Sequence, residues 1–236
     1  MRSHSVVALA TVLLFALGGR ASASIIFSGS GNNPEVSANA SGSATFSISG
    51  NTLTVVLQNT TSPRTTDQGN VMSGVAFDVD SASPVLSLTG TALEGASKIW
   101  TSELASNTSD PLAGSWTNVL GASPLAAYGV ATTGFSGRFN GGSISLGNAG
   151  PNYGIVAVDT FDGTNVAFGG SQFPFIQDSL KFTFTGISGV SESQIANVQL
   201  LFGTDGTGII RTPEPGSMLI LMGLSAGLGC FRVWRR

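Results

Sequence analysis

Histidine and cysteine are almost absent from this chain of 236 residues. Its single histidine is His4 and its single cysteine is Cys230, each close to one end. The long middle of the chain therefore has neither an imidazole nor a thiol. That absence excludes Ser-His-Asp and Cys-His catalysis there. It also excludes zinc, copper or haem sites with His or Cys ligands, and any disulfide bond.

Charged residues are also scarce, at 10% of the chain. Between residues 24 and 212, twelve acidic residues stand against five basic ones, which gives this part a net charge of −7. Contacts to nucleic-acid phosphates depend on clustered Lys and Arg, and no such cluster is present. We therefore expect no nucleic-acid partner, and no residue pattern in the chain calls for a cofactor.

The N-terminal segment, residues 1–23, has the layout of a secretory signal peptide. Arg2 supplies a positive charge, and residues 6–17 form a short apolar core. Small residues then define a cleavage site, with Ala21, Ala23 and Ser24 around the cut. An uncleaved anchor is the alternative, but the core is short for a bilayer span. We expect export through the Sec translocon and removal of the segment by signal peptidase.

The C-terminal segment, residues 213–236, contains three features in a fixed order. Pro213-Glu214-Pro215 comes first, and its two prolines prevent a helix from running straight through it. An apolar run over 218–231 follows, somewhat short for a span unless its flanks anchor at the interface. Basic residues close the chain: Arg232, Arg235 and Arg236. Such residues stay in the cytoplasm, so the preceding part of the chain should lie outside it.

This order of tripeptide, apolar helix and arginine cluster resembles the PEP-CTERM sorting signal of Gram-negative bacteria. The resemblance covers residues 213–236 alone, and a rigid juxtamembrane spacer is the alternative for the tripeptide. It implies processing by an exosortase, which is an integral membrane protease. It further implies transient anchoring in the inner membrane, then release to the cell surface or extracellular matrix. Proteins of this class are associated with exopolysaccharide or biofilm.

The remaining body, residues 24–203, has the composition of a β protein, with Val, Ile, Leu and Phe spaced between Gly, Ser, Thr and Asn. Residues 43–49 and 52–58 alternate apolar and polar side chains around Gly50-Asn51, which predicts a tight hairpin. Further strands are predicted at 71–79, 85–88, 154–158, 165–168, 180–185 and 196–202. We therefore predict one all-β domain, an antiparallel β-sandwich or jelly roll.

Four other stretches are less regular. Residues 92–104 have room for a helical turn or two, although their β-favouring flanks argue against it. Residues 105–153 indicate long loops with short strands. Ser191 and Gln194 have the spacing of a capping box and predict a capped turn before the last strand. Residues 204–212 are predicted to be a flexible linker that leaves the sorting signal accessible.

Carboxylates are the only groups left for catalysis or metal binding. Asp78 and Asp80 lie two apart on a predicted strand and would share one face. Such a pair suits a glycosidase or a Ca²⁺ site, although the ordinary solvent face of a strand is the favoured interpretation. Asp159 and Asp162 are a weak Ca²⁺ candidate, because a plain aspartate-glycine turn is the favoured interpretation.

Aromatic residues gather in the loop-rich middle of the chain: Trp100, Trp116, Tyr128 and Tyr153. If exposed, they are candidates for stacking on sugar rings, and otherwise they anchor the loops. Three functions remain open, in decreasing order of support. They are a structural or adhesive matrix protein without enzymatic activity, a carbohydrate- or Ca²⁺-binding module, and a glycosidase that uses only carboxylates.

Overall fold

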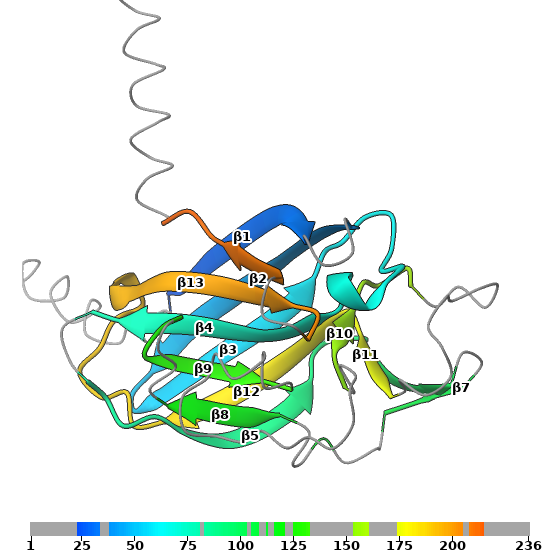
Figure 1. Ribbon diagram of the computed structural model, residues 1–236. Coiled ribbons are helices and arrows are strands. Elements are labelled where there is room, and N and C mark those ends of the chain that lie inside the picture. Colours follow the sequence, from blue (N-terminus) through cyan, green and yellow to red (C-terminus); the bar gives the residue numbers. More distant parts are fainter. Residues whose placement is uncertain are drawn as a thin grey trace, which may run out of the picture.

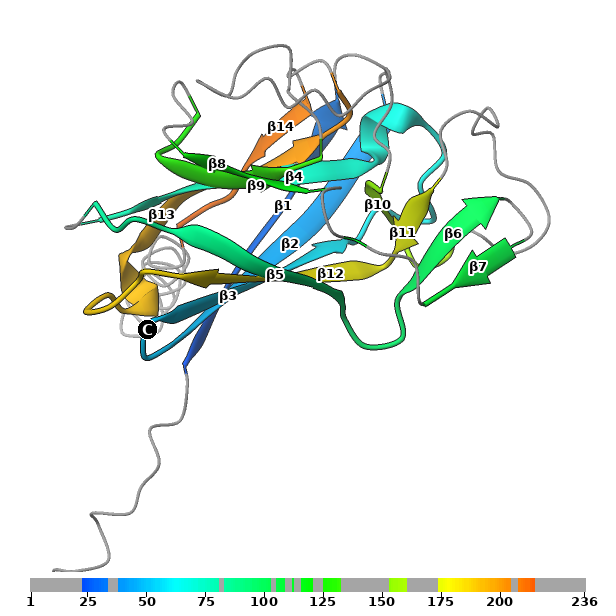
Figure 2. The same ribbon diagram turned by 90° about the horizontal axis from the view of Figure 1, so that it is seen from below.

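The alternating strands of the body assemble into two β-sheets that face each other across a shared apolar core in the computed structural model (Figure 1). The view from below in Figure 2 shows the two layers, with β6 and β7 projecting at one side. The structure describes residues 23–33, 38–80, 83–102, 105–108, 112, 116–120, 125–132, 153–160, 174–204 and 208–214. The predicted signal-peptide core, the apolar run after Pro215 and the terminal arginines lie outside these ranges.

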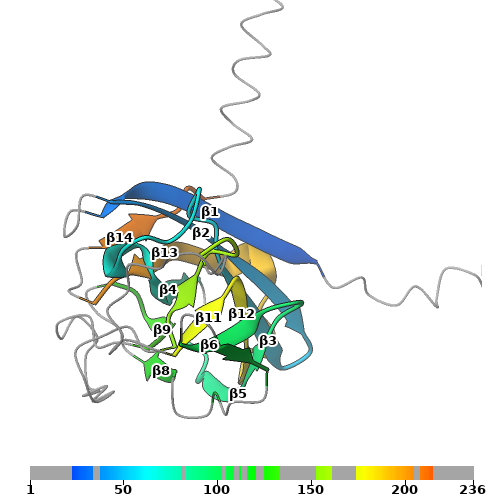
Figure 3. The same cartoon turned by 90° about the vertical axis from the view of Figure 1, so that its right-hand side faces the viewer.

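The first sheet has five antiparallel strands in the order β1-β2-β3-β12-β5. They are β1 (Ser24–Asn33), β2 (Ala38–Ser49), β3 (Thr52–Asn59), β12 (Ser179–Thr185) and β5 (Ser87–Leu93). The predicted hairpin is confirmed as β2 and β3, with Ser49 opposite Thr52 and a positive φ of 61° at Gly50. Figure 3 shows β1 at the outer edge of this sheet.

The second sheet has nine strands, with β14-β13-β4-β10-β11-β6-β7 in order and β9 and β8 attached beside β4. Its strands are β4 (Met72–Val79), β6 (Lys98–Ser102), β7 (Ala105–Asn107), β8 (Thr117–Leu120), β9 (Tyr128–Ala131), β10 (Ile155–Val156), β11 (Phe175–Gln177), β13 (Ile195–Phe202) and β14 (Gly208–Arg211). The β10–β11 pair is parallel, whereas the other pairs are antiparallel.

Two short 3₁₀ helices, η1 (Gln68–Asn70) and η3 (Glu192–Gln194), complete the described elements. The all-β class is therefore confirmed, with one departure from a purely antiparallel arrangement. Within the described ranges, no helix has the length and apolar character needed to cross a membrane. The capped turn before the last strand is η3, where the Ser191 N–H donates to Gln194 Oε1 at 2.9 Å.

The strands predicted at 71–79, 180–185 and 196–202 are confirmed as β4, β12 and β13. The prediction at 154–158 is reduced to the two residues of β10, and that at 85–88 is displaced into β5. The helical turn considered for 92–104 is wrong. The chain there finishes β5, turns at Gly95 and enters β6, because partners in both sheets offer ladder hydrogen bonds. Residues 165–168 lie outside the described ranges.

Aromatic rings connect the two sheets through the core. Phe27 of β1 contacts Phe46 of β2 with ring centroids 5.6 Å apart, and Phe46 contacts Phe77 of β4 at 5.2 Å. Phe77 in turn lies 5.8 Å from Tyr128 of β9. The two contacts of Phe46 are edge-to-face and add to the stabilisation from burial. The alternation read from the sequence thus places one face of each sheet in a single shared core.

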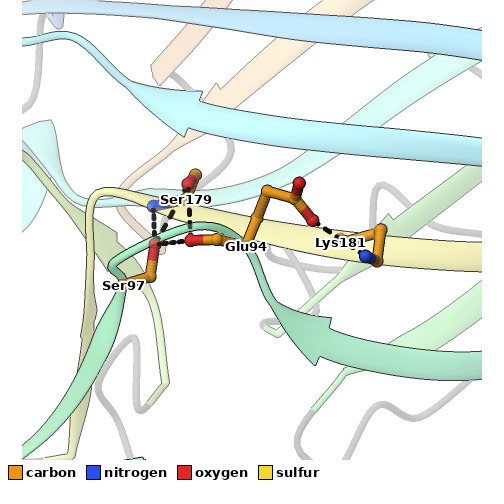
Figure 4. Close-up of polar contacts among 4 residues, drawn as sticks. All are labelled: Glu94, Ser97, Ser179 and Lys181. Atoms are coloured by element: carbon orange, nitrogen blue, oxygen red, sulfur yellow. Dashed lines mark hydrogen bonds and ion pairs between the residues drawn. The ribbon is translucent and has the colours of Figure 1, made fainter.

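Two chain crossings between the sheets lie side by side at one corner, as Figure 4 shows. Here β5 leads into β6, and β11 leads into β12. The Ser97 hydroxyl lies 3.0 Å from that of Ser179 and donates to the Glu94 carbonyl at 2.5 Å. The Glu94 carboxylate points the other way and pairs with Lys181 at 2.9 Å. Both hydroxyls therefore serve the corner itself, and the half-exposed ion pair adds little.

A buried asparagine joins β3 to its neighbours. The Asn59 amide donates to the carbonyls of Asn70 at 2.9 Å and Ile155 at 2.7 Å. Its Oδ1 accepts from the Thr61 N–H at 3.0 Å. One side chain thus forms hydrogen bonds with backbone groups of three separate segments.

Candidate functional site

Trp116 was a candidate for sugar contact, and that prediction is wrong. Only 4% of the residue is exposed, and its ring packs 5.0 Å from that of Phe182 in the core. The indole N–H donates to the Tyr153 carbonyl at 3.1 Å. The indole is buried because its large apolar area stabilises the fold more as core than as exposed surface.

Tyr128 is corrected in the same way. It is 7% exposed, and its hydroxyl donates to the Pro84 carbonyl at 2.8 Å. β9 lies against β4, so the Tyr128 ring faces Phe77 in the core. Its ring face is therefore covered by protein and cannot stack on a saccharide.

Trp100 and Tyr153 are half-buried. The Trp100 indole donates to Gln177 Oε1 at 2.9 Å and packs against the small cluster that contains Phe175. Tyr153 packs on the main core and has a positive φ of 60°. The Trp116 indole contacts the Tyr153 backbone, and Trp100 belongs to the smaller cluster around Phe175. Because Trp116 and Tyr128 are buried, the four predicted residues do not form an exposed aromatic platform.

Asp78 and Asp80 do not form a free carboxylate pair. Asp78 Oδ1 accepts from the Ala127 N–H at 2.6 Å, and its Oδ2 accepts from the Asn197 amide at 2.8 Å. Residues 125–127 cover this face of β4, so the half-buried Asp78 fastens that segment to the sheet. Asp80 is exposed beyond the end of β4. The solvent-face interpretation therefore holds for Asp80 and is wrong for Asp78.

Asp159 is exposed in the turn after β10, and Asp162 lies outside the described residues. The predicted Ca²⁺ pair is therefore not visible as a pair. Across the part of the chain that the structure describes, no group of three or more Asp, Glu, His or Cys residues is close enough to hold a metal ion.

The Tyr128 phenol should make the free energy of unfolding fall at alkaline pH. Burial, with the Asp78 charge as a second cause, raises the pKa of Tyr128 above its ordinary value. The folded protein then keeps this proton where the unfolded chain has lost it. The stabilisation is present below the ordinary value, about pH 10, and is lost as pH rises through the raised value.

We expect Tyr128→Phe to remove this alkaline decline and to cost about 1 kcal/mol at pH 7 through the lost hydrogen bond. Urea unfolding of the wild type and the variant at pH 7 and at about pH 11 measures both effects. Tyr153→Phe is the matched control, because it leaves Tyr128 in place and should retain the decline. Equal pH dependence in wild type and Tyr128→Phe would contradict the prediction.

The segment that leads to the Pro-Glu-Pro tripeptide is fastened to the body. Gly208–Arg211 forms β14 against β13, and Thr212 donates from its backbone N–H and its hydroxyl to the Val198 carbonyl at 3.1 and 2.9 Å. The flexible linker predicted for 204–212 is therefore wrong over 208–212. Ile210 explains the difference: its side chain is 8% exposed and lies against Gly29 and Gly31 of β1.

Pro213 and Glu214 are exposed at the end of this segment, and Pro215 lies outside the described residues. Glu214 Oε1 accepts from the Asn197 N–H at 2.9 Å. That N–H is available because β13 bulges between Ala196 and Gln199, and Asn197 has a positive φ of 48°. Strand β14 and the hydrogen bond between Asn197 and Glu214 thus hold the first two residues of the tripeptide at the surface of the body.

A pocket of about 370 Å³ lies where β1 ends and β2 begins. We call it the polar pocket, and it is lined by neutral residues: Ser30, Gly31, Asn32, Asn39, Ala40, Ser41, Thr61 and Ser62. The Thr61 hydroxyl accepts from the Ser41 N–H at 3.1 Å and fixes one wall against β2. Sequence reasoning missed this site, because alternating Ser and Asn residues there indicated only a solvent face.

Comparisons with protein-family models, with curated proteins and with solved structures found no match for this chain. The functional argument therefore depends on the residues and geometry described above.

Proposed function

We propose that this chain is an exported bacterial surface protein of the PEP-CTERM kind. It passes the inner membrane, is anchored there transiently, is cut by an exosortase, and reaches the cell surface or extracellular matrix. The observation that carries the proposal is the order of tripeptide, apolar run and arginines at the C-terminus. Two described features support it: Pro213 and Glu214 are exposed, and β14 holds them at the edge of the body.

The delivered body acts as a structural or adhesive component of an exopolysaccharide matrix rather than as an enzyme. Its sequence between residues 24 and 212 offers no histidine and no cysteine for catalysis. The carboxylate of Asp78, which a glycosidase of this chain would need, is already engaged by Ala127 and Asn197. An all-β body that presents extended strands to its surroundings suits a matrix role.

The test is processing in a bacterial host with and without its exosortase. An epitope tag between Ser188 and Gly189, in an exposed turn, stays with the body after cleavage at either end. We expect a shorter form at the cell surface when exosortase is present and an uncut membrane form when it is absent. Identical size and location in the two strains would refute the proposal.

Glu214→Gln tests the tripeptide directly. It removes the acidic charge that marks the centre of the motif while changing the side-chain volume little. We expect the uncut membrane form to become the major species in the exosortase-positive strain, as detected by immunoblotting of cell fractions. Glu94→Gln is the matched control, because Glu94 is a half-exposed glutamate on the body and lies outside the tripeptide. Normal processing of both variants would show that exosortase does not recognise the carboxylate of Glu214.

A further inference from the structure

One face of the first sheet carries no charge over three complete strands. β1, β2 and β3 contain no Asp, Glu, Lys or Arg, although the body as a whole has a net charge of −7. Surface strands ordinarily carry charged side chains, which also protect an edge strand from unwanted pairing. These three strands thus present no charged side chain to a ligand, a property that they share with β5, β8, β9 and β13.

The polar pocket is built on two cross-strand pairs of this face. Ser30 lies opposite Ser41, and Asn32 lies opposite Asn39. The side chains of Ser30, Asn32 and Asn39 are exposed. Thr61 and Ser62, from the loop after β3, line the pocket beside them. Hydroxyl and amide groups can each donate and accept, so the pocket offers both kinds of hydrogen bond without any charge.

Beyond the pocket, hydroxyl groups continue along the same two strands. Ser28 pairs with Ser43 and Ser24 with Ser47, and both pairs are on the outward face. Between these two serine pairs lies a row that is mainly apolar. Its middle residue, Thr45 of β2, is opposite Ile26 of β1 on one side and Val56 of β3 on the other. Ile26 is 59% exposed. We call these rows the hydroxyl track, and Figure 3 shows β1 running along the outer edge of the molecule.

This surface has the chemistry of an uncharged, polyhydroxylated ligand. An anionic polymer would meet no cation in the pocket and would be repelled by the acidic body. A sugar chain has hydroxyl groups for the polar rows and apolar C–H faces for the row at Ile26. Successive pairs on one strand face repeat about every 6.8 Å, so a linear polymer can meet several rows at once.

We propose that the polar pocket and the hydroxyl track bind a neutral polysaccharide chain laid along β1 and β2. The proposal rests on the proposed delivery to a polysaccharide matrix and names the partner of the body there. Each contact is weak because the face has no exposed aromatic ring among its described residues, so retention depends on many sugar units and many protein copies.

Affinity electrophoresis of the full chain in mild detergent tests the proposal. Native gels contain dextran, a neutral glucomannan or anionic alginate, or no polymer. We expect at least one neutral polymer to retard the protein and alginate to leave it unaffected. The double variant Asn32→Ala/Asn39→Ala should weaken the association with that polymer about tenfold, because two side-chain hydrogen bonds are lost.

The double variant should fold normally, since the hydrogen bond of Asn39 with Asn70 uses the backbone carbonyl. A melting curve checks this. Ser102→Ala/Ser106→Ala, which removes two exposed hydroxyls on β6 and β7 of the second sheet, is the matched control and should bind like wild type. The following results would each overturn the proposal: no retardation by either neutral polymer, retardation by alginate alone, or equal binding by all variants.

Exosortase processing separates this inference from the proposed function. The Asn32→Ala/Asn39→Ala variant leaves both chain ends intact and should be cut and exported normally. Failure of processing in every variant would therefore count against the sorting proposal, whereas normal processing without polysaccharide binding would count against the site alone.

Discussion

Replacing Phe46 with alanine is expected to lower the free energy of unfolding by about 3–5 kcal/mol. Phe46 is fully buried and lies between Phe27 of its own sheet and Phe77 of the other. Removal of its ring therefore takes away apolar burial and leaves a cavity at the point where the sheets meet. Close packing around the site limits how far the neighbours can move in to fill the space.

Urea unfolding followed by tryptophan fluorescence measures this loss, because Trp116 lies in the same core cluster. Thr45→Ala is the matched control. Thr45 is the preceding residue of β2 and faces outward, so its removal should cost less than about 1 kcal/mol. Equal destabilisation by the two substitutions would mean that Phe46 does not join the sheets as described.

Replacing Asn59 with leucine is expected to cost about 3 kcal/mol or more, although leucine has a similar volume and is more apolar. The substitution leaves the carbonyls of Asn70 and Ile155 and the N–H of Thr61 without their buried partner. Each unsatisfied buried group costs about 1–3 kcal/mol. The added apolar contact offsets only part of that loss.

Gln58→Leu is the matched control for this substitution, since Gln58 is the adjacent amide and its side chain is exposed. Urea unfolding should show a change of less than about 0.5 kcal/mol for this variant. Hydrogen exchange gives a local measurement, because the Thr61 amide should exchange faster in Asn59→Leu than in wild type. Unchanged exchange at Thr61 would contradict the role assigned to Asn59.

Local pattern predicted those elements whose stability depends on near neighbours in the chain. The hairpin of β2 and β3 needs only alternating side chains and a two-residue turn, and both are readable between residues 43 and 58. The capped turn at η3 likewise depends on two residues three apart. Strand β14 could not be predicted, because its stability comes from β13 and from two glycines of β1 that admit Ile210.

The same distinction between local pattern and distant strand partners applies to the candidate sites. Aromatic residues in the loop-rich middle of the chain suggested sugar contact, but whether a ring is exposed depends on which strands pack over it. Trp116 and Tyr128 became core residues, and the polar pocket formed instead from residues that no motif distinguishes. Its members come from β1, β2 and the loop after β3, so only strand pairing brings them together.

The sequence by itself determined the all-β class and the lack of imidazole and thiol groups in the body, since both follow from residue types and their spacing. It also contains the sorting pattern on which the proposed export depends. Only the tertiary structure decided that Asp78 fastens a covering segment, that Glu214 accepts a hydrogen bond from Asn197, and that a polar pocket forms between β1, β2 and the loop after β3. The reason is physical: burial and hydrogen-bond partners at these sites come from strands far apart in the chain, and no local pattern specifies them.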